Sequence, residues 1–227
     1  MSEEMILHCE DSLEGIFTAI YEAFVYKNQM TTPYTDSISI SIGDSVSRSL
    51  FAQEVDVLTD MQKASKTVET IQKRLGYMVY DTIMAALCHY DENRATAVLG
   101  YLVRAFRKET RMFENWADTY VARVMELSRK VGNERQRFLG FLRFRLIPSK
   151  ESFFDVQKVP VVRHEEPRDI LYAQIEPKCN LVPLLMEHFT ERYPGENFII
   201  YDEKRRLAIV HEAFHQSMIV TGANLNV

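Results

Sequence analysis

The segment HEAFH at residues 211–215 has the spacing of a zinc-binding motif. In metalloproteases the two histidines of such a motif lie on one face of a helix, and the glutamate acts as the base. Here the motif follows the strand-like segment LAIV, and the tail after it, QSMIVTGANLNV, contains no further His, Asp or Glu. We therefore predict no catalytic zinc, no other metal and no cofactor for this chain.

His188 is a second candidate for chemistry. It lies on the apolar side of a predicted helix, where most histidines are core residues whose ring nitrogens are satisfied. The alternative is a general acid or base paired with Glu176 or Asp202 across a sheet. These three residues are the catalytic candidates, and whether the chain is an enzyme stays open.

Lysine and arginine are concentrated in one stretch of an acidic chain. Residues 104–145 contain eleven Lys or Arg and five Asp or Glu, a balance of 11 − 5 = +6, whereas the whole chain has a formal net charge of −5. This asymmetry indicates a basic face for an anionic partner, or acidic segments folded onto it. The candidate nucleic-acid-binding residues are Arg104, Arg107, Lys108, Arg111, Arg135, Arg137, Arg143 and Arg145.

The segment FLRFRLI, residues 141–147, alternates with period two and predicts a strand. Its expected core positions are Leu142, Phe144 and Leu146, and its expected polar face carries Phe141, Arg143 and Arg145. On the next strand Tyr172, Gln174 and Glu176 would extend that polar face. Arginine and an aromatic ring on an open sheet can bind phosphate and stack on a base. Equally, Arg143 and Glu176 can form a cross-strand ion pair.

The composition is that of a globular protein outside the membrane. Of the 227 residues, 46% are hydrophobic and 26% are charged, and no apolar run reaches the roughly 20 residues that span a bilayer. The acidic start MSEE is not followed by a signal-type apolar stretch, so we expect a cytoplasmic protein. Cys9, Cys88 and Cys179 are far apart, which predicts neither a disulfide framework nor a closely spaced iron–sulfur motif.

The secondary-structure elements that position these residues are predicted to be mainly helices in the first half of the chain and mainly strands in the second. A strand, MILHCE, precedes a helix capped by Ser12, and SISISI is a short strand or extended loop. Helical periodicity predicts four further helices near residues 60–75, 77–90, 93–109 and 115–130. Gly132 is expected to end the last of them, and Asn133 to begin a short helix.

The second half predicts strands around one helix. After the strand at 141–147 come LYAQI, a helix capped by Asn180 with Pro183 in its first turn, and a hairpin of NFIIYD and LAIVHE. We therefore predict an α+β fold, a helical N-terminal half followed by an antiparallel β-β-α-β-β unit. It is expected to be a single domain, helix-rich over 1–140 and sheet-containing over 141–227, with an irregular insertion near 148–169.

Several segments in this order resemble a bacterial family assigned to DNA metabolism or DNA repair. The segments are LEGIFTAIYEAF, VDVLTDMQKASKTVETI, ERQRFLGFLRF, LYAQIEP and LLMEHFTERYPGENFIIYDEKRR. The positions that match its motifs are Glu134, Arg137, Phe141, Arg143, Phe144, Glu176, Pro177, His188, Phe189, Arg192, Asp202 and Arg205. The chain departs from the family's pattern in the insertion near 148–169.

The resemblance implies a partner and leaves the activity open. Members of that family are typically encoded beside a radical-SAM protein, and some are fused to a uracil-DNA-glycosylase-like domain that we do not find here. The resemblance therefore implies an accessory protein that binds nucleic acid and works with a radical-SAM partner. The alternatives are an enzyme that acts on DNA or a nucleotide by His/carboxylate chemistry, and a protein–protein adaptor.

Overall fold

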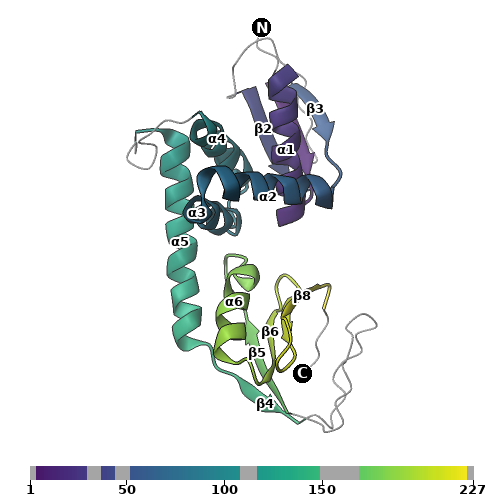
Figure 1. Cartoon of the computed structure of the whole chain (residues 1–227), viewed down its shortest axis with the longest axis vertical. Coiled ribbons are helices and arrows are strands. Elements are labelled where there is room, and N and C mark those ends of the chain that lie inside the picture. The colour runs from purple at the N-terminus through teal and green to yellow at the C-terminus, as the bar shows by residue number, and fades with distance from the viewer. Residues whose placement is uncertain (1–3, 30–36, 44–51, 108–116, 149–168, 224–227) are drawn as a thin grey trace. The chain divides into compact units, whose positions relative to one another are not determined.

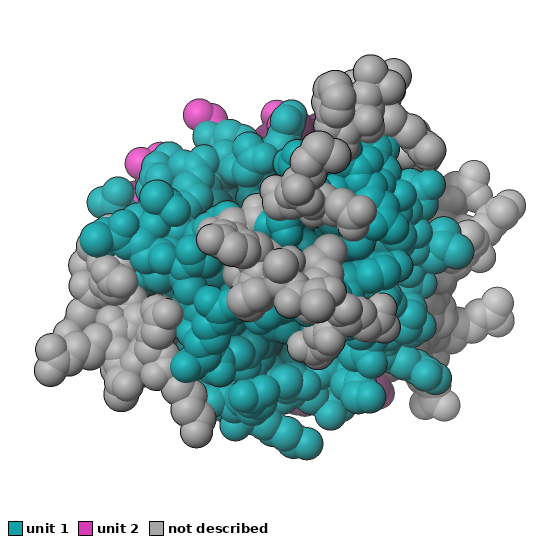
Figure 2. Space-filling model, turned by 90° about the horizontal axis from the view of Figure 1, so that it is seen from above, with its two compact units in different colours: residues 1–130 teal, residues 131–227 magenta. Residues whose placement is uncertain are grey.

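The computed structural model describes residues 4–29, 37–43, 52–107, 117–148 and 169–223 (Figure 1). It confirms the predicted α+β class and the helical N-terminal half. The chain divides into two compact units, residues 1–130 and 131–227, which Figure 2 shows in different colours. That the chain forms a single domain stays a prediction.

The first unit combines a small parallel sheet with a group of helices. Its elements are β1 (Glu4–Cys9), α1 (Leu13–Gln29), β2 (Ile38–Ile42), β3 (Ala52–Asp56), α2 (Met61–Leu75), α3 (Tyr77–Leu87), α4 (Arg94–Phe106) and the start of α5 (Thr119–Phe141). The strand order is β2-β1-β3, and both pairs are parallel. The predicted strands β1 and β2 are confirmed, whereas β3, AQEVD, is too polar for a strand to be expected from its pattern.

The core of the first unit follows from simple periodicities. In β1 every second side chain, from Met5 through Leu7 to Cys9, is buried. From α1, Ile16 and Ile20 pack into the same cluster. Helix α4 is buried on nearly all sides, and this is why its sequence RATAVLGYLVRAF is so apolar.

The helix starts are set by capping side chains. The Ser12 hydroxyl accepts a hydrogen bond from the Gly15 amide at 3.0 Å, which confirms the predicted cap of α1. The Asp60 carboxylate accepts from the amides of Gln62 and Lys63 at the start of α2. Helix α2 ends at Gly76, whose φ of 87° lies in the left-handed region that glycine adopts without strain.

The prediction that Gly132 ends a helix is wrong. Helix α5 continues through Gly132 and Asn133 to Phe141, so the short second helix expected there is part of α5. The reason is that a glycine inside a helix costs only about 1 kcal/mol, and the apolar face of α5 continues beyond it. Val131 is buried on that face and Phe138 is half-buried.

The second unit is a five-stranded sheet with one helix between two of its strands. Its elements after α5 are β4 (Arg145–Ile147), β5 (Ile170–Ile175), α6 (Val182–Arg192), β6 (Asn197–Asp202), β7 (Leu207–His211) and β8 (Met218–Thr221). The strand order is β4-β5-β6-β7-β8. The β-β-α-β-β succession is as predicted, but the sheet is mixed, because α6 carries the chain across so that β5 and β6 run parallel while the other pairs are antiparallel.

Strand β4 is shorter than predicted, and the residue that faces the core is Ile147 instead of Leu146. It begins at Arg145 because the helical segment extends to Phe141. Leu146, expected in the core, is 66% exposed, whereas Ile147 packs with Tyr172 and Ile199. Phe144 precedes the strand, and its ring lies edge-on to Phe189 of α6 at 5.7 Å. The one-position shift follows from the later start of the strand.

Helix α6 is capped differently from the prediction. Its N-cap residue is Leu181, which makes no side-chain capping bond, and Pro183 lies in the first turn as expected. The side-chain oxygen of Asn180 is buried without a hydrogen-bond partner among the described residues, so the prediction that Asn180 caps the helix is wrong. The backbone of the β5–α6 loop is instead held by hydrogen bonds from the side chains of Glu134 and Arg205, which lie outside α6.

Two further predictions concern the chain's periphery. Of the predicted insertion at 148–169, residues 149–168 lie outside the described residues. None of the helices within the described ranges has the length and apolar character that crossing a bilayer requires.

Candidate functional site

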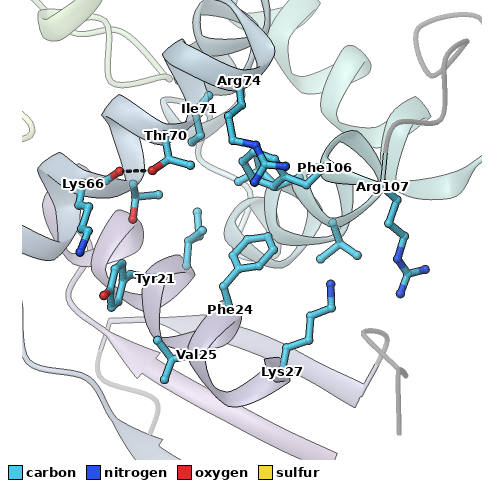
Figure 3. A pocket seen from close by; sticks show the side chains of 14 residues that line it. Tyr21, Phe24, Val25, Lys27, Lys66, Thr70, Ile71, Arg74, Phe106 and Arg107 are labelled. Atoms are coloured by element: carbon cyan, nitrogen blue, oxygen red, sulfur yellow. Dashed lines mark hydrogen bonds between the residues drawn. The ribbon is translucent and has the colours of Figure 1, made fainter. Parts of the chain in front are cut away.

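Three helices of the first unit surround a pocket of about 460 Å³ (Figure 3). Its charged side chains come from α1, from α2, and from the residue after α4; they are Lys27, Lys66, Arg74 and Arg107. Its apolar part consists of Ile20, Phe24, Val25, Ile71, Leu102, Val103 and Phe106. Among the described residues that line the pocket there is no aspartate and no glutamate.

Helical spacing brings these cations together from distant parts of the sequence. On α2, Lys66, Thr70 and Arg74 recur every four residues and so lie on one face. On α1, Phe24 and Lys27 are three residues apart, and Phe106 and Arg107 lie at the end of α4. The sequence analysis identified only Arg107, because it searched one basic stretch of the chain. The signals it missed are a lysine three residues after an aromatic residue on α1 and two cations on one face of α2.

Aromatic rings position the cations. The guanidinium carbon of Arg74 lies 4.7 Å from the centre of the Phe106 ring, as Figure 3 shows. The Nζ atom of Lys27 lies 5.4 Å from the Phe24 ring centre. The Phe24 and Phe106 rings meet edge to face at 5.6 Å. Since cation–π contact holds the charge but uses none of its N–H donors, those donors stay available for an anion.

The pocket is electropositive. Burial and then the charge of Arg107 lower the pKa of Lys27 below its usual value. Lys27, Lys66 and Arg74 make no side-chain hydrogen bond or ion pair through their charged groups to any residue that the structure describes. A negatively charged ligand would therefore relieve the repulsion among Lys27, Lys66 and Arg74, which no carboxylate of the described residues pairs with.

Arg104, predicted to contact nucleic acid, instead makes its contacts within the first unit. Its side chain pairs with Asp118, donates to the carbonyl of Gly100 at 3.1 Å and lies 4.4 Å from the centre of the Tyr120 ring. Burial of Asp118 would raise its pKa, but the hydrogen bond from Arg104 and two backbone N–H groups lower it overall. The charge of Arg104 is thus neutralised. Lys108 and Arg111 lie outside the described residues.

The four predicted arginines of the second unit have different surroundings. Arg135 donates to the carbonyl of Leu184 at 2.9 Å, and the guanidinium of Arg145 lies 4.8 Å from the Tyr172 ring centre. Arg137 and Arg143 are exposed and contact no charged partner in the described part of the chain. Arg143 lies before β4, not on it. Because Arg104 and Arg107 belong to the other unit, one continuous basic surface stays a prediction.

The predicted polar face of the sheet is only partly polar. Tyr172 is buried in the cluster with Ile147 and Ile199, so it offers no open stacking face, and that part of the prediction is wrong. Gln174 is exposed and donates to Glu203 at 2.5 Å. Glu176 is exposed, and within the described residues it forms no ion pair with Arg143.

The three catalytic candidates do not form a hydrogen-bonded group. Asp202 is fully buried and accepts from the side chain of Arg205 at 2.9 Å and from its amide at 3.2 Å. The Nε2 atom of His188 is buried, and no described residue forms a hydrogen bond with it. No hydrogen bond or ion pair among the described residues joins His188 to Glu176 or Asp202. The acid–base assignment stays a prediction.

A carboxylate and a guanidinium hold the loop between β5 and α6. Glu134 of α5 accepts from the amides of Lys178 at 2.8 Å and Cys179 at 3.0 Å. Arg205 donates to the carbonyls of Pro177, at 3.0 Å, and Lys178. Although burial raises the pKa of Glu134, its hydrogen bonds from Cys179 and Lys178 and the charge of Arg205 lower it overall. Several family-matching positions therefore have a structural role, which the sequence analysis missed.

The HEAFH segment is not helical. His211 ends β7, and the following residues form a turn in which Phe214 has a φ of 65°. The Nδ1 atom of His211 shares a hydrogen bond of 3.0 Å with the Ser217 hydroxyl. The two histidines thus lack the common helix face of a zinc protease. Among the described residues no group of three or more His, Cys, Asp or Glu side chains is placed to hold a metal ion.

Comparison with known proteins identifies a family. Residues 92–224, more than half of the chain, match DUF4130, a domain of unknown function. The chain belongs to this family. The matched range covers the second unit as far as residue 224, and the α4 side of the pocket. No curated protein and no solved structure matches the chain.

Proposed function

We propose that this member of the DUF4130 family is a non-enzymatic DNA metabolism or repair accessory protein that binds nucleic acid and works with a radical-SAM partner. One observation carries the proposal: an acidic chain gathers four cations around one pocket, and the described residues that line it include no aspartate or glutamate. Phosphate oxygens are the natural ligands of such N–H donors. The resemblance to DNA metabolism proteins favours nucleic acid as the source of the phosphate.

The radical chemistry is assigned to the partner. Cys9, Cys88 and Cys179 are each buried and form no disulfide, and their spacing does not match that of an iron–sulfur motif. In this proposal the chain supplies binding, and the partner supplies the reaction. The place of action is the cytoplasm.

The test is fluorescence anisotropy with labelled single- and double-stranded oligonucleotides at two salt concentrations. Affinity should fall steeply with salt, and each lost phosphate contact should shallow the logarithmic slope by roughly 0.7 to 0.9. Arg74→Glu should weaken binding to all sequences. Lys73→Glu is the matched control, because Lys73 is an exposed neighbour on the same helix end that does not line the pocket. Absence of binding at low salt would reject the proposal.

A protein–protein adaptor is the second candidate. Large apolar side chains are exposed on the second unit: Phe141 and Phe214 at 76% each and Leu146 at 66%. Exposed apolar groups of this size are typical of interaction surfaces when they are contiguous. A competition between DNA and the purified radical-SAM partner separates the two candidates, because an adaptor would bind the partner and no DNA, whereas the accessory protein would bind DNA in a way that Arg74→Glu weakens.

A further inference from the structure

The pocket in the first unit has the size of a single nucleotide. Its volume of about 460 Å³ lies within the range of roughly 300–1,000 Å³ that small-molecule sites occupy. A DNA duplex cannot enter such a space, since its major groove alone is about 12 Å wide. A ligand that enters the pocket must therefore be small, and a single nucleotide unit is the part of a nucleic acid that fits.

The polar lining offers donors and few acceptors. The Thr70 hydroxyl donates to the carbonyl of Lys66 at 2.6 Å, and the Thr67 hydroxyl lies within hydrogen-bond distance of the carbonyls of Lys63 and Phe17. Their protons are used by backbone carbonyls, so the side-chain donors left for a ligand include those of Lys27, Lys66 and Arg74 and the hydroxyl of Tyr21. The polar part of the ligand must be an acceptor of high charge.

A phosphate monoester meets this requirement better than a backbone diester. A monoester carries about −1.5 to −2 charges at neutral pH and three acceptor oxygens, whereas a diester carries a single charge. Lys27, Arg74 and Arg107 lie around the rings of Phe24 and Phe106, as Figure 3 shows. The apolar floor behind them, which includes Ile71 and Leu102, suits the flat face of a base.

We propose that this pocket recognises a single phosphorylated nucleotide, with its monoester beside Lys27 and Arg74 and its base against the apolar lining. The inference rests on the proposed function and narrows it from nucleic acid in general to a phosphorylated nucleotide. Two sources share this chemistry: the terminal nucleotide of a single strand that carries a 5′- or 3′-phosphate, and a free nucleotide.

The experiment compares short single strands that differ only at their ends. Labelled oligonucleotides with a 5′-phosphate, a 3′-phosphate or hydroxyls at both ends are titrated by anisotropy, with adenosine monophosphate as competitor. A phosphorylated end should bind at least about tenfold more tightly than a hydroxyl end, because a doubly charged group meets several cations. Arg74→Gln should abolish this preference, and Lys73→Gln should preserve it. Melting curves of both variants check that each is folded.

Each outcome decides one of the two proposals. Equal affinity for phosphorylated and hydroxyl ends, with weaker binding by Arg74→Gln, overturns the inference and leaves nucleic-acid binding intact. An end preference that survives Arg74→Gln places the site elsewhere and overturns the inference. If no strand binds, the proposed function is overturned, and calorimetry with adenosine monophosphate then decides the inference. Binding of adenosine monophosphate that Arg74→Gln removes would support a free nucleotide as the ligand. Absence of this binding would reject the inference.

Discussion

Arg104 and Arg107 are only three residues apart in the sequence, but Arg104 has a structural role and Arg107 is a candidate ligand-binding residue. Arg104 is enclosed by Asp118, the Gly100 carbonyl and the Tyr120 ring. Arg107, one turn later, lies at the edge of a pocket whose lining includes Lys27 and Arg74. Charge alone therefore does not identify a binding residue, because Arg104 is neutralised by Asp118 inside the unit whereas Arg107 lines a pocket.

At the scale of single residues, the substitution His188→Leu should keep or raise the melting temperature of the protein. The Nε2 atom of His188 is buried without a partner in the described residues, and such a group costs roughly 1–3 kcal/mol. Replacing the ring with an apolar side chain removes that cost on an otherwise apolar helix face. Thermal denaturation checks it, and His188→Gln, which keeps polar atoms at the site, should be less stable than His188→Leu. Marked destabilisation by His188→Leu would reveal a hydrogen bond that the described contacts lack.

Glu134→Gln should destabilise the protein in a pH-dependent way. The folded pKa of Glu134 is lowered, so its carboxylate contributes stability at neutral pH and loses it as the pH falls below the unfolded value of about 4.3 and through the folded pKa. We expect a loss of about 1–2 kcal/mol at pH 7 that shrinks towards pH 3. Urea denaturation at both pH values measures it. Glu187→Gln, an exposed position on α6, is the control and should show no such trend.

At the scale of elements, α4 and α5 approach closely at Gly100. A Cβ atom on Gly100 would lie 2.3 Å from the Tyr120 ring, far inside contact distance. Gly100→Ala should therefore destabilise the first unit by about 1–3 kcal/mol, although alanine is the better helix former. Gly132→Ala is the matched substitution within α5, where a Cβ atom would meet nothing within 4 Å. It should stabilise by about 0.5–1 kcal/mol.

The melting temperature should fall in the Gly100→Ala variant and rise in the Gly132→Ala variant, relative to the parent protein. A Gly100→Ala variant as stable as the parent would mean that the Tyr120 ring moves at little cost. A destabilised Gly132→Ala variant would mean that the α5 helix is interrupted at Gly132, as the sequence pattern predicted.

Local patterns predicted the elements better than the contacts between them. Period 3.6 located α2, α3 and α4 to within a few residues at each end, because their apolar stripes face one core. The parallel pairing of β5 with β6 could not be read in this way, since pairing direction depends on where α6 carries the chain. The pocket was missed for the same reason: Lys27, Lys66 and Arg74 become neighbours only through helix packing.

At the scale of the whole molecule, the question is whether both units contact one nucleic acid strand. The chain is acidic overall, with a net charge of −5, yet it exposes Arg143 and Arg145 on the second unit and gathers four cations in the first. Two sites on one chain bind one strand more tightly than either site alone, because the second contact becomes intramolecular. That gain requires a strand long enough to reach both sites.

The length of the strand therefore separates a shared surface from two independent ones. With oligonucleotides of about 6 nucleotides, close to the smallest single-strand site sizes, Arg74→Glu should weaken binding, whereas Arg143→Glu with Arg145→Glu should have little effect. With strands of about 30 nucleotides, both changes should weaken binding and shallow the salt slope, by roughly 0.7 to 0.9 for each lost contact. Anisotropy at two salt concentrations measures this, with melting curves as the control for folding, because Arg145 lies over the Tyr172 ring. If the double variant binds long strands as well as the parent does, Arg143 and Arg145 are solvated side chains and only the first unit binds nucleic acid.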